Sequence, residues 1–481
     1  MGTALNNKIL SASKCSALTE VIAKLVTPIS TMVLARLLTP EAFGILVTAT
    51  MVISFAEIFT DAGFQKYLIQ HDFDSDDDKY QATTVAFWCN FILSLAIWIA
   101  IVCFSNPIAS LVGCSGYGLV IIVVSICIPL GAFSSIQMAL YKRHLDFKTL
   151  FVVRIIGICI PLIFTIPIAF LTRSYWSLVL GMILLNFVNA IVLTVKSPWK
   201  PKLFFNFSVL KKMFSFSVWT VVESLSIWFT SYIDIFLVGA VLGQYYLGVY
   251  RTSMTLVSQI TSVIVNATTP VLFSSLSRNQ NDKDSFRKIF FDFQKVVGLA
   301  LFPLAIFIYL FKDIIVDILL GNEWRDAAYF IGIWGLSSAV VIVFSHYSSE
   351  VYRALGKPRC SFLAQVLHLL FLVPIIFLFV EKDFNTFCFA RTVARYQVVL
   401  VNIVLLYIVV KISPICIFKN LWPILLSSGN MLLVAYLFKF LLHFNTVLLM
   451  PVVLIAYFAT MMSFSDGRKG ILQIKQLLKK S

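Results

Sequence analysis

The sequence predicts an all-α integral membrane protein with about 14 transmembrane helices. Hydrophobic residues make up 59% of the 481 positions and charged residues only 13%, whereas about a quarter of the residues in a soluble domain are charged. Apolar runs long enough to cross a hydrocarbon core roughly 30 Å thick recur along the whole chain. These runs lack the strict alternation of barrel strands, and helices satisfy their own backbone hydrogen bonds in lipid.

The predicted spans follow one another with short connections, which leave no room for a soluble catalytic domain. They cover residues 15–37, 44–64, 83–104, 118–140, 149–171, 175–195, 216–240, 247–275, 290–311, 328–349, 361–380, 387–410, 421–442 and 446–464. The first run lacks a small-residue cleavage site, so we expect a retained helix and not a signal peptide.

The distribution of basic residues predicts the orientation, because Lys and Arg stay preferentially in cytoplasmic loops. If the N-terminus is inside, most basic residues outside the spans fall in the inner loops, among them Lys66, Lys142 and Arg143. Few fall in the outer loops: Arg36, Arg173, Lys312, Arg325, Lys382 and Lys439. We therefore expect both termini in the cytoplasm. The net charge of +15 lies mostly in short loops beside the membrane, where it suits bilayer lipids as partners. No nucleic-acid partner is expected.

An internal repeat predicts the domain organisation. Gly44 and Thr48 of the first half correspond to Gly248 and Thr252 of the second. Because the repeat unit is six helices, an even number, both copies have the same topology and are expected to form two lobes around a central cavity. The predicted division is an N-lobe (1–195), a cytoplasmic linker (196–215), a C-lobe (216–410), two additional helices (411–465) and a basic cytoplasmic tail (466–481).

Ionisable residues inside the spans are the candidates for function. Each costs about 2.5–3.5 kcal/mol at mid-bilayer, so it normally faces a cavity or a partner. The cations expected to bind substrate in the cavity are Lys24, Arg154, Arg251, Arg391 and Arg395. Such groups hold phosphate oxygens by charge-assisted hydrogen bonds, which suits a phosphate-bearing substrate. The acids expected to couple transport to an ion, or to form structural pairs, are Glu20, Asp61, Glu223 and Asp234.

Other patterns argue against an enzyme and against a cofactor or a metal site. The acidic run 72–78 has carboxylates where a calcium loop needs them, but Asp77 and Thr83 stand in place of the required Gly and Glu. We interpret this run as a solvated cytoplasmic loop. The sequence has no Walker motif and no paired carboxylates in an outer loop.

Three pairs of motifs occur in an order typical of one family. They are ARLLTPEAFG (35–44) with DAGF (61–64), YIDIFLVG (232–239) with LGVY (247–250), and LGNEW (320–324) with ALGK (354–357). On these motifs, roughly residues 15–410 resemble the polysaccharide transport family of the multidrug/oligosaccharidyl-lipid/polysaccharide (MOP) exporter superfamily, which includes O-antigen flippases. The motifs are specific to the family and not to one substrate.

The resemblance implies two six-helix lobes in a V, alternating access and a location in the bacterial inner membrane. It implies that an undecaprenyl-diphosphate-linked oligosaccharide, the unit of an O-antigen, a lipopolysaccharide or a related surface polysaccharide, moves from the cytoplasmic to the periplasmic leaflet. Other membrane proteins of polysaccharide assembly are possible partners. Lys24 and Arg251 match the family's cavity cations on the first and eighth helices, whereas the second helix carries Glu57 and Asp61.

Two alternative functions stay open from the sequence. A cation-coupled multidrug exporter of the same superfamily needs an apolar cavity with one acidic cluster. A membrane polysaccharide polymerase or ligase would act on the same lipid-linked substrate. Such an enzyme usually needs a large outer loop with catalytic residues, which the predicted connections do not provide.

Overall fold

The computed structural model describes residues 22–24, 26–61, 63–144, 146–441, 445–464 and 467–468. Every regular element within these residues is a helix. Twelve helices in this part of the chain are long and apolar enough to cross a bilayer. The chain is therefore an all-helical, multi-pass membrane protein, as the sequence predicts.

Two of the predicted spans form one helical segment in the structure, and some predicted segments lie outside the described residues. The predicted spans 216–240 and 247–275 both lie in one continuous segment, α11 (Phe207–Arg278), in which Gly243 has φ 84° and ψ 176°. That backbone conformation is open essentially to glycine alone, so α11 consists of two helices that meet at Gly243. Glu20 and most of the predicted tail (466–481) lie outside the described residues, as does part of the first predicted span. The number of 14 spans stays a prediction.

Contacts divide the chain into two compact units, unit 1 (Met1–Arg251) and unit 2 (Thr252–Ser481). The first helix of α11 therefore belongs to unit 1 by its contacts, although the sequence assigns it to the C-lobe. The lobes, the linker and the additional helices were predicted as parts of a repeat and not as contact units, so they stay predictions.

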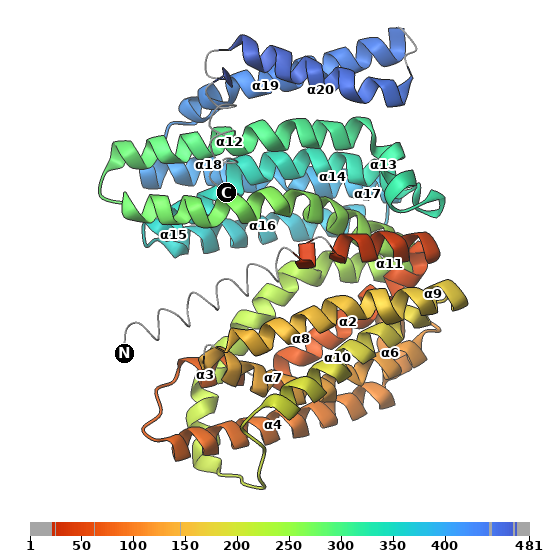
Figure 1. Cartoon of the computed structure of the whole chain (residues 1–481), viewed down its shortest axis with the longest axis vertical. Helices are drawn as coiled ribbons and strands as arrows, with labels where there is room; N and C mark the ends of the chain where they lie inside the picture. Colours follow the sequence, from red (N-terminus) through yellow and green to blue (C-terminus); the bar gives the residue numbers. More distant parts are fainter. Residues whose placement is uncertain are drawn as a thin grey trace. The chain divides into compact units, whose positions relative to one another are not determined.

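Unit 1 is a bundle in which α7 has a central place, because α7 contacts α3, α4, α8 and α10. Figure 1 shows α4, α7, α10 and α8 side by side. Polar pairs join these helices where they cross: Asn90 donates to Ser135 at 2.9 Å and Gln137 to Thr194 at 3.1 Å. The helices before α11 are α2 (Pro40–Asp61), α3 (Phe64–Gln70), α4 (Asp76–Cys103), α5 (Ser105–Leu111), α6 (Gly118–Ser125), α7 (Cys127–Arg143), α8 (Phe147–Ile160), the π-helix η1 (Pro161–Thr165), α9 (Ile166–Thr172) and α10 (Trp176–Lys196).

The repeat-related residues of α2 and α11 pack directly against each other within unit 1. A Cβ on Gly44 would collide with the carbonyl of Gln244, and a Cβ on Gly248 would collide with the carbonyl of Pro40. Pro40 and Gly44 correspond in the repeat to Gln244 and Gly248. The contact is therefore reciprocal, as expected around a two-fold axis between equivalent elements.

Gln244 closes this contact with two further hydrogen bonds. Its Oε1 accepts from the Thr48 hydroxyl at 2.8 Å, and its Nε2 donates to the Gly113 carbonyl at 2.9 Å. Both Thr48 and Gln244 are buried. The close approach of two backbones at the glycines is thus held by a fully bonded amide.

Unit 2 is a second helical bundle, in which α12 contacts both α14 and α19, and α19 contacts α20. Tyr457 of α20 is fully buried and donates to the Leu299 carbonyl of α12 at 3.2 Å. Its helices after α11 are α12 (Lys283–Leu310), α13 (Lys312–Leu319), the 3-10 helix η2 (Asn322–Trp324), α14 (Ala327–Val341), the π-helix η3 (Ile342–His346), α15 (Tyr347–Ala354), α16 (Pro358–Phe379), α17 (Phe384–Ala394), α18 (Tyr396–Val410), α19 (Pro414–Tyr436), the π-helix η4 (Leu437–Leu441) and α20 (Thr446–Ser463).

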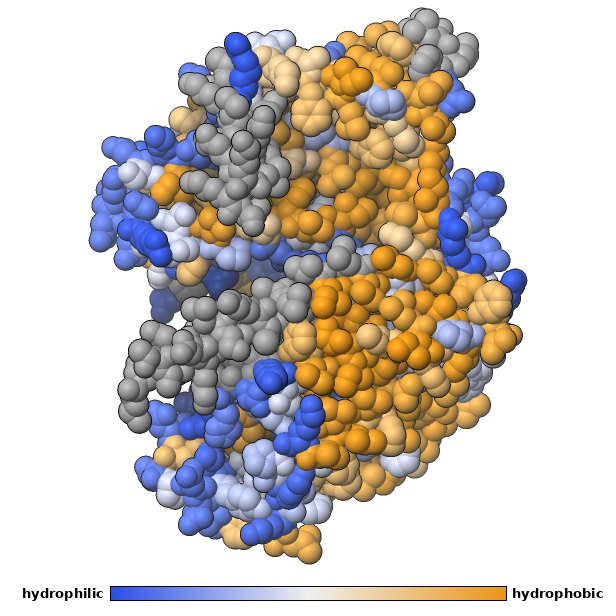
Figure 2. Space-filling view, viewed as in Figure 1, coloured by the Kyte–Doolittle hydropathy of each residue, from blue (hydrophilic) through white to orange (hydrophobic). Residues whose placement is uncertain are grey.

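The surface of each unit has the polarity of a membrane protein. Figure 2 shows broad apolar surfaces over the middle of the helices and hydrophilic residues toward their ends. Large apolar side chains stand exposed on both units, among them Leu171 at 81% and Leu370 at 67%. Contiguous exposed apolar surface of this extent is expected to face lipid.

Candidate functional site

A cavity of about 700 Å³ lies within unit 1 and contains two basic side chains, Lys142 and Arg154. Its lining also includes Ser30 and Thr31 of the helix at 26–37 and Asn189 of α10. We call this cavity the cation pocket. Arg154 was predicted as a cavity cation, whereas Lys142 was assigned only to a cytoplasmic loop.

Local sequence explains why the two cations lie where they do. Asp146 caps the start of α8, because its side chain accepts from the Thr149 backbone N–H at 3.2 Å and from the Thr149 hydroxyl at 2.8 Å. Arg154 follows two helical turns later on α8. Lys142 lies in the last turn of α7, where a cation is favoured by the helix dipole.

The chemistry of the cation pocket suits an anion. Guanidinium and ammonium groups carry only donors, and they bind phosphate oxygens with charge-assisted hydrogen bonds. Asn189 adds an amide to the lining; its buried Oδ1 atom, which has no hydrogen-bond partner among the described residues, accepts hydrogen bonds and therefore suits a donor on the ligand, not the anion itself. Lys24 does not line this cavity, but it lies one turn before Thr27, a lining residue, on the same face of its helix.

Asp61 lies at the end of α2 and interacts electrostatically with two lysines. The positive charges of Lys142 and of Lys66 both act on its carboxylate. Its Oδ1 atom is buried, with no hydrogen-bond partner in the described part of the chain. Asp61 was predicted as a coupling or structural acid, and its surroundings are compatible with either role.

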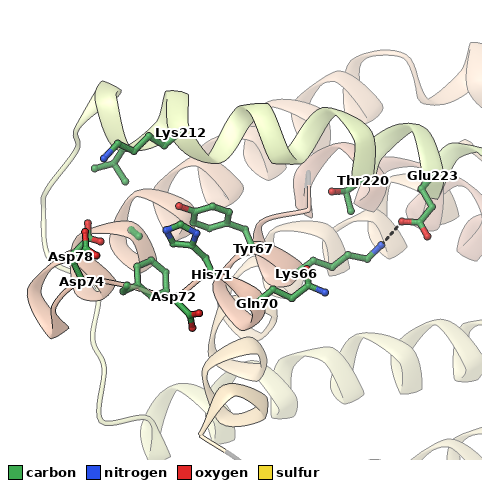
Figure 3. Close-up of a pocket in the computed structure, with 13 residues that line it drawn as sticks. Lys66, Tyr67, Gln70, His71, Asp72, Asp74, Asp78, Lys212, Thr220 and Glu223 are labelled. Atoms are coloured by element: carbon green, nitrogen blue, oxygen red, sulfur yellow. Dashed lines mark hydrogen bonds and ion pairs between the residues drawn. The ribbon is translucent and has the colours of Figure 1, made fainter.

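A second cavity, of about 1160 Å³, lies between α3, the segment 71–78 and the first part of α11 (Figure 3). We call it the polar pocket. At one end, Lys66 and Glu223 form an ion pair of 2.8 Å in which both side chains are about half exposed. Its lining consists of Lys66, Tyr67, Gln70, His71, Asp72, Phe73, Asp74, Asp78, Ala82, Val209, Lys212, Thr220 and Glu223.

Arg143 positions the wall of the polar pocket. Its Nη1 atom donates to the carbonyls of Leu68 at 2.8 Å and of His71 at 2.7 Å, which are orphan acceptors at the end of α3. The same guanidinium lies 4.8 Å from the centre of the Phe73 ring. Burial, together with the charge of Asp78, raises the pKa of Tyr67, so this phenol stays protonated at neutral pH.

The predicted acids of α11 have protein partners. Asp234 is buried, and its carboxylate accepts from the Tyr250 hydroxyl at 2.8 Å and from the Ile235 backbone N–H at 2.9 Å. Glu223 is bound to Lys66 in the partly exposed pair described above. Arg251 is partly buried and follows Tyr250 directly. These bonds favour a structural role for Asp234, while its role in coupling stays a prediction.

The predicted cations of unit 2 gather around one indole. The guanidinium of Arg395 lies 3.8 Å from the ring centre of Trp334, and that of Arg391 lies 5.3 Å from it. Arg395 also donates to the hydroxyls of Ser337 at 2.8 Å and Ser338 at 3.0 Å. The indole of Trp334 is thus a shared cation–π partner for two like charges one turn apart.

Sequence reasoning missed three residues that build these pockets: Lys66, Lys142 and Arg143. All three were taken as markers of orientation, because they lie next to spans in basic loops. The acidic run 72–78 was interpreted as solvated, and most of it is exposed; Asp72, Asp74 and Asp78 also line the polar pocket, which the sequence did not indicate. The sequence did contain one indication: Lys142 and Arg143 directly follow the predicted span 118–140, so the same helix could be expected to continue through them.

Comparison with known proteins gives a consistent family. A family model described as "Polysaccharide biosynthesis protein" matches residues 33–329. The succinoglycan biosynthesis transport protein ExoT of Rhizobium meliloti (strain 1021) is 22% identical over 311 residues, which are 64% of this chain and 62% of that protein. The lipopolysaccharide biosynthesis protein WzxC of Escherichia coli (strain K12) is 21% identical over 328 residues, 67% of this chain and 65% of that one.

Other relatives extend this range. The teichuronic acid biosynthesis protein TuaB of Bacillus subtilis (strain 168) is 21% identical over 360 residues, 74% of each chain. The match to ExoT spans less than two thirds of that protein's length. The predicted resemblance to the polysaccharide transport family is confirmed by these findings.

Solved structures show the fold. The lipid II flippase MurJ in an inward closed conformation has a TM-score of 0.72 and 16% identity, and the match covers 92% of this chain and 97% of that one. An inward-facing multidrug-resistance transporter of the MATE family of the MOP superfamily has a TM-score of 0.62 and 11% identity, with 83% and 98% of the two chains covered. The described helices therefore have the fold of the MOP superfamily.

Proposed function

Because the chain belongs to the polysaccharide biosynthesis protein family, we propose that it is a flippase for an undecaprenyl-diphosphate-linked oligosaccharide. The lipid-linked unit moves from the cytoplasmic to the periplasmic leaflet of the bacterial inner membrane. The relatives ExoT, TuaB and WzxC are named for three different polysaccharides. A shared family across three glycans supports recognition of a common carrier group, and a diphosphate on a lipid is such a group.

The observation that carries this proposal is the cation pocket. Lys142 and Arg154 share a cavity of about 700 Å³ among helices of membrane-spanning length. A charged side chain inside a membrane normally faces a cavity or a partner, and a cavity lined by two cations offers a place for an anion. A diphosphate supplies that anion, while the lipid chain stays in the bilayer. Lys24, one helical turn before the lining residue Thr27, adds a further positive charge near this cavity in the proposal.

The reciprocal contact of Gly44 and Gly248 supports the proposed mechanism of alternating access. Equivalent residues of two repeats meet around a two-fold axis, which is how like-oriented lobes are related in transporters of this architecture. Each lobe then rocks against the other about a fixed site. In this proposal both termini are cytoplasmic, and other membrane proteins of polysaccharide assembly receive the translocated unit.

The remaining predicted site residues take separate parts in the proposal. Asp61 is the acid for ion coupling, because it lies beside the pocket cations and its neutralisation alters the charge that the diphosphate meets. Arg391 and Arg395 form a second cationic cluster for the substrate during transit, held by Trp334 until then. Glu20 and Arg251 keep their predicted roles, coupling and substrate binding respectively.

The experiment that tests the function is a deletion strain with complementation. We expect the lipid-linked oligosaccharide to accumulate on the cytoplasmic leaflet in the deletion strain. Arg154→Ala and Lys142→Ala should lower flipping by about 10- to 100-fold each, since a lost hydrogen bond to a charged group costs about 1.5–3 kcal/mol. Lys148→Ala is the matched control, because Lys148 lies on the same helix as Arg154 but does not line the pocket.

The outcome separates the proposal from its rivals. Normal export in the Arg154→Ala/Lys142→Ala double variant, at a protein level equal to wild type, would refute the role of the cation pocket. A cation-coupled drug exporter should instead tolerate Arg154→Glu. A polymerase or ligase should leave unpolymerised product on the periplasmic face of the deletion strain.

A further inference from the structure

We propose that the polar pocket binds the glycan part of the substrate and takes uncharged or amino-bearing sugars in preference to acidic ones. This inference rests on the proposed function, because it assigns the sugars of the same lipid-linked molecule to a site of their own. It goes beyond that function in naming a class of glycan. Lys66, Tyr67, His71 and the three aspartates of the pocket carry the argument.

The size of the polar pocket fits more than one sugar ring. Its volume of about 1160 Å³ lies above the roughly 300–1,000 Å³ of most small-molecule pockets. All of its walls come from unit 1, from α3, the segment 71–78, the first turns of α4 and the first helix of α11 (Figure 3). The ligand therefore meets side chains from segments that are far apart in the sequence.

Three aromatic rings meet at the wall of this otherwise polar cavity: Tyr67 is buried in the core behind it, and His71 and Phe73 are the rings that a ligand can reach. The rings of Tyr67 and His71 are stacked with centres 4.6 Å apart, and Phe73 meets His71 edge-on at 5.0 Å. Arg143 holds Phe73 from one side. A pyranose ring has an apolar C–H face and a rim of hydroxyls, and it therefore complements an aromatic surface bordered by polar groups.

The carboxylates of the pocket suit the hydroxyls of a sugar better than a metal ion. When they are ionised, Asp72, Asp74 and Asp78 carry hydrogen-bond acceptors and no donor. Among the described residues, no group of three or more His, Cys, Asp or Glu side chains is placed to hold a metal ion. The acceptors are thus spread along the cavity and not converged on a point, as hydroxyl donors around a ring require.

Charge decides which sugars fit. Four acids and two lysines line the pocket, and Glu223 already binds Lys66 at 2.8 Å. The charges of Lys66 and Glu223 cancel, which leaves the three aspartates against the single positive charge of Lys212. The lining is therefore net negative, in a chain whose overall charge is +15. A uronate would be repelled, an uncharged sugar accepted, and an amino sugar attracted.

The polar pocket is linked to the cation pocket through α7. The consecutive residues Lys142 and Arg143 serve the two cavities, the first as a lining group and the second through the carbonyls of α3. Asp61 experiences the charges of both Lys142 and Lys66. The diphosphate would lie in the positively charged cation pocket, and the attached sugars would lie in the negatively charged polar pocket.

The test measures binding to the full-length protein in lipid nanodiscs by calorimetric titration. The probes are maltotriose, a fully deacetylated chitosan trimer and trigalacturonate. We expect the first two to bind and trigalacturonate to bind about tenfold more weakly or not at all. Phe73→Ala should weaken the binding of maltotriose by about tenfold, because the contact between a sugar face and an accessible ring is lost. Asp74→Asn/Asp78→Asn should remove the discrimination against trigalacturonate.

The matched control is Asp76→Asn/Asp77→Asn, which removes the same charge from the same segment at positions that do not line the pocket. Its binding should equal that of the wild type. No binding of any probe at millimolar concentration, equal binding of trigalacturonate, or an equal effect of the control overturns the inference. Tight binding of trilysine without binding of maltotriose would identify a basic protein partner instead, and would also overturn it.

These outcomes are distinguishable from failure of the proposed function. Flipping that depends on Arg154 and Lys142 in cells, with no sugar binding to the purified protein, would leave the flippase proposal intact and remove this inference. Sugar binding to the purified protein, without accumulation of lipid-linked oligosaccharide in the deletion strain, would refute the flippase proposal and leave the sugar-binding pocket.

Discussion

The contact between Gly44 and Gly248 predicts a large effect for Gly248→Ala. The added Cβ would collide with the Pro40 carbonyl oxygen and lie 2.7 Å from its carbonyl carbon. Ordinary carbon contacts are about 3.5–4.0 Å, so α2 and α11 have to separate by about 1 Å. The colliding atoms belong to the backbone, and no side-chain rotation can relieve them.

The structure allows the cost to be worked out. A shift of about 1 Å breaks the hydrogen bonds of Gln244 to Thr48 and Gly113, now 2.8 and 2.9 Å long, at about 0.5–1.5 kcal/mol each. Overpacking adds about 1–3 kcal/mol. We expect a loss of about 2–6 kcal/mol in the free energy of unfolding. Gln244→Ala alone should cost only the hydrogen-bond part.

The measurement is reversible unfolding by sodium dodecyl sulfate in mixed micelles, followed by circular dichroism. Gly429→Ala is the matched control, because Gly429 is exposed on α19 and a Cβ there meets nothing within 4 Å. It should be neutral or stabilising by up to about 1 kcal/mol. Equal stability of the two variants would refute the reasoning that these backbones touch.

Three further predictions concern single side chains. Arg143→Ala should destabilise the end of α3 by about 2 kcal/mol, since two carbonyls lose a charged donor; faster hydrogen exchange over α3 would show this, and an unchanged rate would contradict it. Arg395→Ala should lower the free energy of unfolding by about 2–3 kcal/mol in the same assay. Arg395→Lys should be intermediate, because an ammonium keeps the positive charge over Trp334 but lacks the planar guanidinium. Wild-type stability of Arg395→Lys would argue against a role for the planar guanidinium. Asp383 caps α17, and hydrogen bonds from Thr386 hold the pKa of its carboxyl below the usual value. The stabilisation is present above the unfolded pKa and is lost as pH falls through the lower folded pKa. Exchange at the start of α17 should therefore rise in acid, and Asp383→Asn should flatten that dependence.

Much of the fold could be predicted because its causes are local. The apolar run 175–195 predicts a span, and α10 covers Trp176–Lys196, since lipid leaves a long apolar segment few alternatives to a helix. The break at Gly243 falls between the predicted spans 216–240 and 247–275. The equivalence of Gly44 and Gly248 was visible as a repeat, but their mutual contact was not.

The candidate site was less predictable, because a charge in a span can meet several partners. Arg391 and Arg395 were selected as cavity cations; both lie over Trp334, and Arg395 also donates to two serines. Their role in substrate binding stays a prediction. Asp234 was selected as an ionisable group in the membrane, and Tyr250 satisfies it. The residue pattern of one helix does not predict which residue of a neighbouring helix will contact it.

The sequence by itself determined that this protein is a multi-pass helical membrane protein of a polysaccharide family, because apolar length, charge asymmetry and motif order are properties of the chain. Only the tertiary structure decided which charges share a cavity. Lys142 joins Arg154, and Lys66 joins Glu223, through helices whose rotation and crossing bring together residues distant in sequence. The physical reason is that lipid dictates where helices form, whereas packing between helices dictates which of their faces meet.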